Sequence, residues 1–363
     1  MHMADALLSP VVGGGMWAVS AGTIAYCSSK VHKEMDDSKI PLMGVLGAFI
    51  FAAQMVNFSI PVTGSSGHLG GGLILSVLLG PYAAFLTIAS VLMVQALFFA
   101  DGGLLALGCN IFNLGFFPAF IAYPLLYKRI IGSHPTAARI SAASIIAAIV
   151  GLQLGSFAVV LETTFSGISS LSFPTFVALM QPIHLAIGIV EGLVTAMVIT
   201  FVYKARPEIL QSTLDGRVVE RHSVRNVALA FLAATVVTGG VVSWFASKNP
   251  DGLEWAIKQV TGQEELKEPD QGLYAVLKGL QQKTAFLPDY TFKNPADSKK
   301  ETALPETSRQ PNTGDLVISP GHRPSVNPIH SAGTSLAGLV GGTLTLGLAC
   351  LTGFLLKRRN QTK

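Results

Sequence analysis

His2 is the strongest candidate for metal-binding chemistry, because it directly follows the amino-terminal residue. The α-amine of Met1, the backbone nitrogen of His2 once deprotonated, and the His2 imidazole can close two fused chelate rings on a metal ion. These three nitrogens lie in one plane and leave one equatorial position open. A complete amino-terminal copper or nickel motif places histidine third, whereas Met3 stands there in this chain. A fourth nitrogen must therefore come from another part of the sequence.

His68 is the candidate for that fourth nitrogen. It lies in a glycine-rich stretch, residues 64–72, where glycine lets two backbone segments approach closely. Four nitrogens in a plane suit Ni²⁺ or Cu²⁺ and allow Co²⁺, whereas tetrahedral Zn²⁺ fits poorly. We therefore expect Met1, His2 and His68 to bind Ni²⁺ or Co²⁺, with no catalytic residue and no organic cofactor. The alternative is that His68 caps a helix and the glycines only ease packing.

Several polar side chains lie inside apolar segments and are candidates for supporting roles. Gln54 and Asn57 stand about one helical turn apart, just before the His68 stretch, and His184 lies seven residues before Glu191, on the same helix face. Hydrogen bonding between helices is the favoured role for such residues. The alternative for Gln54, Asn57 and His184 is that they hydrogen-bond the metal ligands and orient them.

The chain that must position these residues is strongly apolar. Of its 363 residues, 50% are hydrophobic and 13% are charged, about half of the roughly 25% charged residues of a soluble domain. Between Pro41 and Tyr127 the only formally charged residue is Asp101. This composition predicts an all-α polytopic membrane protein. The net charge of +4 comes from scattered Lys and Arg, which argues against nucleic acid as a partner.

Apolar stretches long enough to cross a membrane set the expected topology, since about 20 residues span a hydrocarbon core of about 30 Å. They are residues 11–28, 42–60, 82–99, 103–127, 139–161, 175–203, 226–247 and 334–356. A shorter run, 69–80, ends at Gly80-Pro81, where a helix would break. It brings the count to about nine transmembrane segments, seven of them before Arg206. We expect the short segment to be broken near 70–72, a second break flanked by Asn110 and Asn113, and a turn at Asp101.

Basic residues set the expected orientation, because loops rich in Lys and Arg face the cytoplasm. They cluster at Lys30, Lys33 and Lys39, at Lys128, Arg129 and Arg139, between Lys204 and Arg225, and at Lys357, Arg358 and Arg359. The amino terminus and the His68 loop are then outside and the carboxyl terminus is cytoplasmic. The expected division is a metal-binding membrane domain (1–205), a cytoplasmic linker (206–225), a second membrane part (226–356) and a basic tail (357–363).

The second membrane part contains a polar loop, residues 248–333, which the topology places outside. Asp251 can cap the start of a helix, and Glu254 stands at the spacing of a capping box. We expect this helix to end near Gly262. Residues 294–331 have the composition of a flexible linker.

Three stretches resemble the CbiM/NikM family: MHMADALLSP at 1–10, GSSGHLGG at 64–71 and HLAIGIVEG at 184–192. Members of this family are substrate-binding membrane subunits of energy-coupling factor (ECF) transporters for cobalt and nickel. The sequence PDGLEW at 250–255 resembles the PDGLE motif of the small companion subunit CbiN/NikN. The chain therefore resembles a fusion of the two subunits, with the first likeness covering about residues 1–205.

The resemblance implies that Met1, His2 and His68 are the metal ligands. It also implies a membrane-embedded T subunit (CbiQ/NikQ-like) and ATPase subunits (CbiO/NikO-like) as partners, in the lipid of a bacterial or archaeal plasma membrane. The chain itself lacks a Walker-type loop, so ATP hydrolysis is expected in those partners and not here. Nickel and cobalt both stay open, with the planar nitrogen set favouring nickel. A passive metal facilitator and a membrane metalloenzyme are the alternatives.

Overall fold

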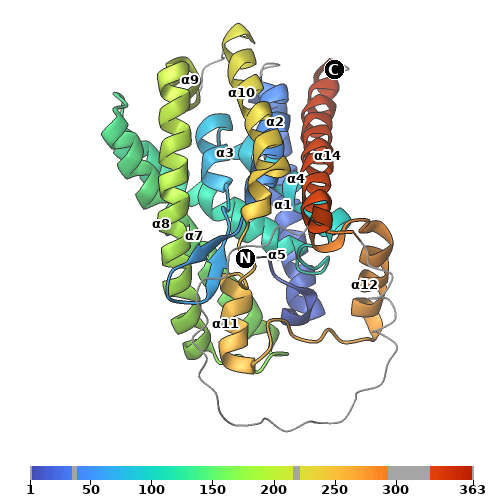
Figure 1. Cartoon of the computed structure of the whole chain (residues 1–363). Coiled ribbons are helices and arrows are strands. Elements are labelled where there is room, and N and C mark those ends of the chain that lie inside the picture. The colour runs from blue at the N-terminus through green and yellow to red at the C-terminus, as the bar shows by residue number, and fades with distance from the viewer. Residues whose placement is uncertain (1, 35–38, 216–220, 293–327, 362–363) are drawn as a thin grey trace, which may run out of the picture.

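A computed structural model describes residues 2–34, 39–215, 221–292 and 328–361. In these ranges, five helices are long and apolar enough to cross a membrane: α4 (Pro81–Phe99), the helix Leu107–Ile131, α7 (Ala137–Ser166), α8 (Phe173–Ala205) and Ala332–Lys357 within α14 (Pro328–Gln361). Two shorter apolar helices are α2 (Lys39–Gln54) and Val224–Gly240 within α10 (Arg221–Gly240). This arrangement, shown in Figure 1, confirms the predicted all-α membrane fold.

The remaining elements are the 25-residue helix α1 and a set of shorter helices and strands. They are η1 (Asp5–Leu7), α1 (Pro10–Glu34), β1 (Phe58–Ile60), β2 (Ser65–Gly67), α3 (Gly72–Leu79), α9 (Pro207–Asp215), η3 (Val242–Phe245), α11 (Gly252–Thr261), α12 (Gly272–Thr284) and η4 (Pro288–Tyr290). Strands β1 and β2 pair antiparallel, with Phe58 opposite Gly67. This hairpin carries the chain from α2 to His68.

The short apolar run is helix α3, whose residues are all buried. Its eight residues rise about 12 Å, so α3 alone does not cross a hydrocarbon core. It begins after Gly71, whose φ of +76° suits glycine, and ends at Gly80, with Pro81 opening the next helix. The predicted end at Gly80-Pro81 is confirmed. A helix this short leaves the backbone on its amino-terminal side to form the loop that carries His68.

The break expected around Asn110 and Asn113 is absent. Residues Leu107–Ile131 form one continuous helix, which changes from α winding in α5 (Leu107–Ile111) to π winding in η2 (Phe112–Tyr127) and back to α in α6 (Lys128–Ile131). Two prolines, Pro118 and Pro124, lie inside the π stretch, where their missing N–H groups would interrupt ordinary α-helical bonding. The polar side chains are thus presented from an unbroken helix.

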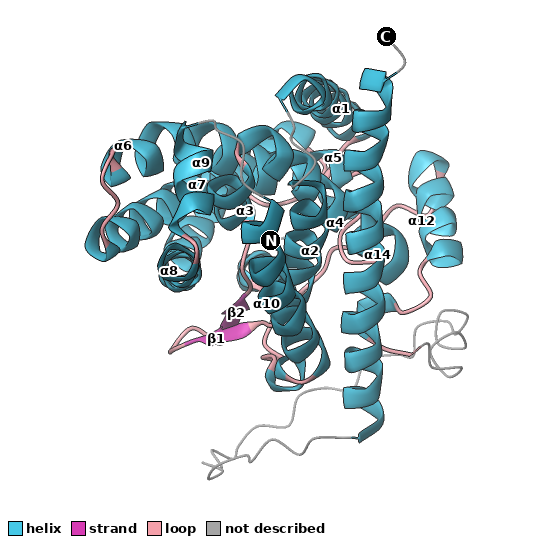
Figure 2. Ribbon diagram, turned by 90° about the horizontal axis from the view of Figure 1, so that it is seen from above, coloured by secondary structure: helices cyan, strands magenta, loops and turns pink. Residues whose placement is uncertain are grey.

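The second membrane part packs on the first through α2, which contacts both α10 and α14. The two later helices also touch each other at glycines: a Cβ on Gly338 would lie 2.5 Å from the Gly239 carbonyl. Seen from above in Figure 2, α7 and α8 lie at one side of the molecule and α14 and α12 at the other. Most of the expected linker 294–331 lies outside the described residues. After α10, helix α11 packs on α8.

Candidate metal centre

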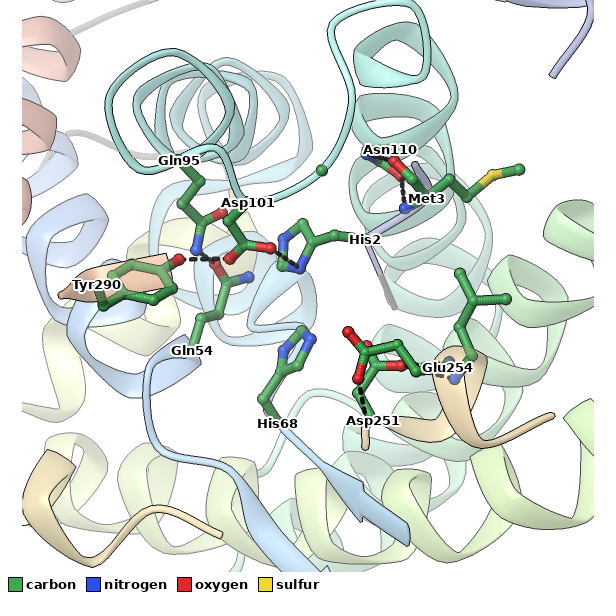
Figure 3. A network of polar contacts seen from close by, with 12 residues as sticks. His2, Met3, Gln54, His68, Gln95, Asp101, Asn110, Asp251, Glu254 and Tyr290 are labelled. Atoms are coloured by element: carbon green, nitrogen blue, oxygen red, sulfur yellow. Dashed lines mark hydrogen bonds and ion pairs between the residues drawn. The ribbon is translucent and has the colours of Figure 1, made fainter. Parts of the chain in front are cut away.

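The structure brings His2 and His68 together. Their rings are stacked, with centroids 5.0 Å apart and planes 16° from parallel. The His2 side chain is 7% exposed and His68 is 8% exposed, so both imidazoles are buried. Figure 3 shows them side by side, one from the amino-terminal segment and one from the loop after β2. Met1, the third expected ligand, lies outside the described residues.

The amino-terminal segment is fixed by hydrogen bonds to a distant part of the chain. The Met3 backbone N–H donates to Oδ1 of Asn110 (2.8 Å), and the Asn110 amide donates back to the Met3 carbonyl (3.2 Å). The same carbonyl accepts from the N–H of Gly103 (2.9 Å), and Oδ1 of Asp5 accepts from the N–H of Ala106 (2.9 Å). These contacts with the loop 100–106 and with Asn110 hold the segment that carries His2 in place.

Asp101, expected only to shape a turn, also orients His2. Its Oδ1 lies 3.3 Å from Nδ1 of His2, and its Oδ2 accepts a hydrogen bond from the Tyr290 hydroxyl. The sequence carried a signal for this role, because Asp101 is the only formally charged residue between Pro41 and Tyr127. Charge in so apolar a stretch marks function by default. The Asn110 contact had no comparable signal in the sequence.

The ring nitrogens of the two histidines have different surroundings. Nδ1 of His68 lies 3.1 Å from the Leu69 carbonyl, an acceptor, so Nδ1 carries the proton and Nε2 carries the lone pair. In His2, Nδ1 faces Asp101, and Nε2 is buried without a hydrogen-bond partner among the described residues. A chelate ring that includes the His2 backbone nitrogen can close only through Nδ1. Such a chelate therefore requires the His2 ring to turn away from Asp101.

Burial favours the neutral form of both imidazoles. Loss of solvent lowers the pKa of His2 below its ordinary value of 6.5, although the nearby Asp101 carboxylate raises it in part. Burial lowers the pKa of His68 well below the same value. Neutral rings offer the lone pairs that a metal ion requires.

The loop after His68 is held by two buried polar side chains. Glu191 on α8 accepts hydrogen bonds from the N–H groups of Gly70 (3.1 Å) and Gly71 (3.0 Å). Gln54 on α2 donates to the Gly70 carbonyl (2.9 Å) and accepts from the Gln95 amide (2.9 Å). The contact between Gln54 and Gln95 joins α2 and α4, as expected for hydrogen bonding between helices, whereas Glu191 bonds the loop backbone and not another helix. Both side chains fix the backbone directly after His68.

The other two candidates for supporting roles are placed differently. Asn57 lies just before β1, where its backbone carbonyl accepts a hydrogen bond from Ser247 (2.7 Å). His184 is 1% exposed on α8, and its Nδ1 lies 2.8 Å from the Met180 carbonyl. Its ring lines the same small cavity as His68. The structure thus brings His184 to the cavity that His68 also lines.

The segment 247–255 docks on the hairpin that leads to His68. The Ser66 N–H donates to the Pro250 carbonyl (2.8 Å), the Ser66 hydroxyl donates to the Asn249 carbonyl (2.8 Å), and the Trp255 indole donates to the Thr63 carbonyl (2.9 Å). This docking joins the second membrane part to the histidine pair. Spacing along the sequence gave no sign of it.

The predicted capping box at the start of α11 is confirmed, and so is its end at Gly262. Asp251 Oδ1 accepts from the N–H groups of Leu253 (2.7 Å) and Glu254 (2.9 Å), while Glu254 accepts from the Asp251 N–H (2.8 Å). Burial, with the charge of Asp251, raises the pKa of Glu254 to about 7. Figure 3 shows both side chains on one side of His68, with Gln54 on the other.

Residues 2–209 match the family described as the cobalt uptake substrate-specific transmembrane region, CbiM. The chain belongs to the CbiM family. Residues 225–358 match the PDGLE domain, so a CbiM region and a PDGLE region are fused in one chain. The resemblance read from the motifs at 1–10, 64–71, 184–192 and 250–255 is therefore confirmed.

Relatives and solved structures agree with this assignment. A fused NikMN protein of Archaeoglobus fulgidus is 29% identical over 365 residues, covering 100% of both chains. The fused nickel transport protein NikMN of Rhodobacter capsulatus is 30% identical over 237 residues, which are 61% of this chain and 67% of that protein. The crystal structure of a transition metal transporter, 29% identical, superposes with a TM-score of 0.51 and covers 58% of this chain and 97% of that one.

Proposed function

We propose that this CbiM-family chain is the substrate-capture subunit of an ECF-type importer for Ni²⁺ or Co²⁺. The observation that carries the proposal is the buried, stacked pair of His2 and His68 beside the start of the chain. Relatives are named as nickel or cobalt transport proteins, which favours a transporter over an enzyme. The transported ion is the substrate of this site.

In the proposed site the ion is held by the Met1 α-amine, the backbone nitrogen and Nδ1 of His2, and Nε2 of His68. A bond from a metal to an imidazole nitrogen is about 2 Å long, so rings with centroids 5.0 Å apart are within reach of one ion. Nδ1 of His2 exchanges its contact with Asp101 for the ion. Four nitrogens in a plane favour Ni²⁺ over Co²⁺.

Transport needs energy from elsewhere, because the sequence has no Walker-type nucleotide loop. We propose that ATPase subunits hydrolyse ATP and that a membrane-embedded T subunit transmits the change to this chain. With the amino terminus outside, the ion is captured from the outer side and released inward. Passive facilitation by this chain alone is the competing function.

The deciding experiment is a titration of the purified full chain with Ni²⁺ and Co²⁺, using a native, untagged amino terminus. A twin sample carries one extra residue ahead of Met1, which removes the α-amine from the chelate. We expect stoichiometric tight binding in the native sample and its loss in the twin. Equal binding in both samples would refute the amino-terminal chelate.

Uptake assays separate the two transport functions. We expect Ni²⁺ uptake by cells that express this chain together with ATPase and T subunits, and none from cells that express this chain alone. Uptake by the chain alone would favour passive facilitation.

A further inference from the structure

A small cavity lies between the CbiM region and the PDGLE region. Gly67 and His68 line it from the hairpin loop, His184 and Ile187 from α8, and Asp251 and Gly252 from the start of α11. Gly252 packs over the edge of the His184 ring, since a Cβ there would lie 3.1 Å from Cε1, the carbon between the two ring nitrogens. The cavity is therefore lined by two histidines of the CbiM region and by one aspartate of the PDGLE region.

His184, which lines this cavity, has a buried ring nitrogen that no hydrogen bond uses in the described part of the chain. Its Nδ1 lies 2.8 Å from the Met180 carbonyl, which can only accept, so Nδ1 holds the ring proton and Nε2 carries the lone pair. Nε2 is buried and has no hydrogen-bond partner in the part of the chain that the structure describes. Buried polar atoms of folded proteins are nearly always paired, so an unpaired one calls for an explanation. A lone pair on a fixed imidazole nitrogen is the usual ligand for a transition-metal ion.

Asp251 supplies a negative charge to the same cavity. Both of its helix-capping bonds end on Oδ1, which anchors the carboxylate on the backbone of α11. The segment that carries it is fixed on the hairpin by the bonds from Ser66 to Asn249 and Pro250. A carboxylate held this rigidly beside an imidazole lone pair forms a mixed nitrogen and oxygen donor set.

We propose that Nε2 of His184 and the carboxylate of Asp251 form a second cation site, next to the amino-terminal chelate. This inference rests on the proposed function. Nitrogen and oxygen donors with water in the remaining positions suit a divalent transition-metal ion that still carries part of its hydration shell. The amino-terminal chelate, in contrast, takes the ion only after the α-amine and the backbone nitrogen have lost protons.

The two sites act in sequence. The His184–Asp251 site holds the partly hydrated ion against His68, which lines the same cavity, and His68 takes it over into the chelate. Holding the ion beside its final ligands makes the transfer intramolecular and so raises its effective concentration. In this arrangement the PDGLE region contributes a ligand and not only a structural contact.

The test is Ni²⁺ binding by the full chain with a native amino terminus, in a His2→Ala background that removes one chelate ligand. Two further substitutions keep the local structure. Asp251→Asn retains a side chain that caps helices well. His184→Asn retains an amide N–H for the Met180 carbonyl. The matched controls are Asp270→Asn, whose side chain is 88% exposed, and His134→Asn, which removes an exposed imidazole.

We expect His2→Ala to abolish tight binding and to leave weaker residual binding. His184→Asn and Asp251→Asn should each weaken that residual binding by about tenfold or more. Even the loss of a group that only hydrogen-bonds a metal ligand lowers metal affinity by about 10–100-fold. The controls should stay within about twofold, as surface substitutions do. In the chain that keeps His2, both variants should retain the chelate and its visible Ni²⁺ absorption, which also shows that they fold. If one variant does not fold, Asp251→Ser keeps the helix cap without the carboxylate.

Each failure has its own signature. If His2→Ala leaves tight binding unchanged, the amino-terminal chelate and the proposed function fail. If His2→Ala abolishes tight binding but no residual binding remains, the chelate stands and the His184–Asp251 site is overturned. Residual binding that is equal in the two variants and the controls overturns the second site as well.

Discussion

Asn110 holds the amino-terminal segment through two hydrogen bonds with the backbone of Met3. In Asn110→Ala, the Met3 N–H loses the acceptor that lies 2.8 Å away. The Met3 carbonyl loses one donor but keeps the N–H of Gly103 at 2.9 Å. The net change is therefore one buried donor without a partner, because Met3 is 0% exposed and Asn110 is 2% exposed.

The magnitude follows from that unpaired donor. Leaving a buried donor unsatisfied costs about 1–3 kcal/mol. The segment can recover this energy only by moving away from α5, which separates His2 from His68. Since about 1.4 kcal/mol is a factor of ten in a dissociation constant, we expect Asn110→Ala to weaken Ni²⁺ binding by about 5- to 150-fold.

The assay is calorimetric titration of the purified full chain with Ni²⁺, accompanied by thermal unfolding of the metal-free protein. Ser20→Ala is the matched control, because the Ser20 hydroxyl is also fully buried and donates to the Gly108 carbonyl (2.6 Å) on the helix that carries Asn110. We expect Ser20→Ala to affect unfolding but not affinity. The reasoning is refuted if both variants weaken Ni²⁺ binding equally, or if Asn110→Ala unfolds earlier while its affinity is unchanged.

Three further outcomes are expected. Glu191→Gln replaces one of the two oxygens that accept the N–H groups of Gly70 and Gly71 with an amide nitrogen, which cannot accept. One buried N–H is then left without a partner, which costs about 1–3 kcal/mol. The melting temperature and the Ni²⁺ affinity should both fall, and unchanged values would contradict the role given to Glu191. Gly103→Ala places a Cβ within 2.5 Å of Asp5, the first residue of η1, and should lower the melting temperature. Gly14→Ala is the control, because its Cβ would meet nothing within 4 Å, and it should leave the melting temperature unchanged. Equal melting temperatures of the two variants would contradict this reasoning. Burial lowers the pKa of His2 and His68 below 6.5, so it favours the neutral form of both rings as the pH falls toward that value. Ni²⁺ affinity should therefore fall more steeply with decreasing pH below about pH 7.7–8.0, where a free α-amine gains a proton. A further steepening near pH 6.5 in Ni²⁺ titrations would contradict the lowered pKa of the two histidines.

Features that depend on neighbouring residues could be predicted from the sequence. The near absence of charge between Pro41 and Tyr127 predicted membrane helices, because such a stretch cannot form a surface in water. Gly80-Pro81 predicted a helix end, and the spacing of Asp251 and Glu254 predicted a capping box with both of its bonds. In each case the interacting atoms belong to residues within about one helical turn, so the local sequence contains the whole interaction.

The candidate site could be predicted only in part. The donor atoms of His2 and the glycine-rich surroundings of His68 indicated metal-binding chemistry, but no pattern gave the distance between the rings. Their stacking at 5.0 Å depends on the helices α2, α3 and α8 that shape the His68 loop. Met1 stays a prediction, since it lies outside the described residues.

The contacts that fix the site join residues far apart in the chain. Asn110 bonds to Met3 across 107 positions, and the hydroxyl of Ser66 bonds to Asn249 across 183. Asp101 meets His2 because the loop 100–106 folds over the amino-terminal segment. Pairings of this kind arise when whole helices pack and each buried polar group must then find a partner within reach. Local residue spacing does not contain that information, so Asn110, Asp101 and the PDGLE segment took their roles only in the folded chain.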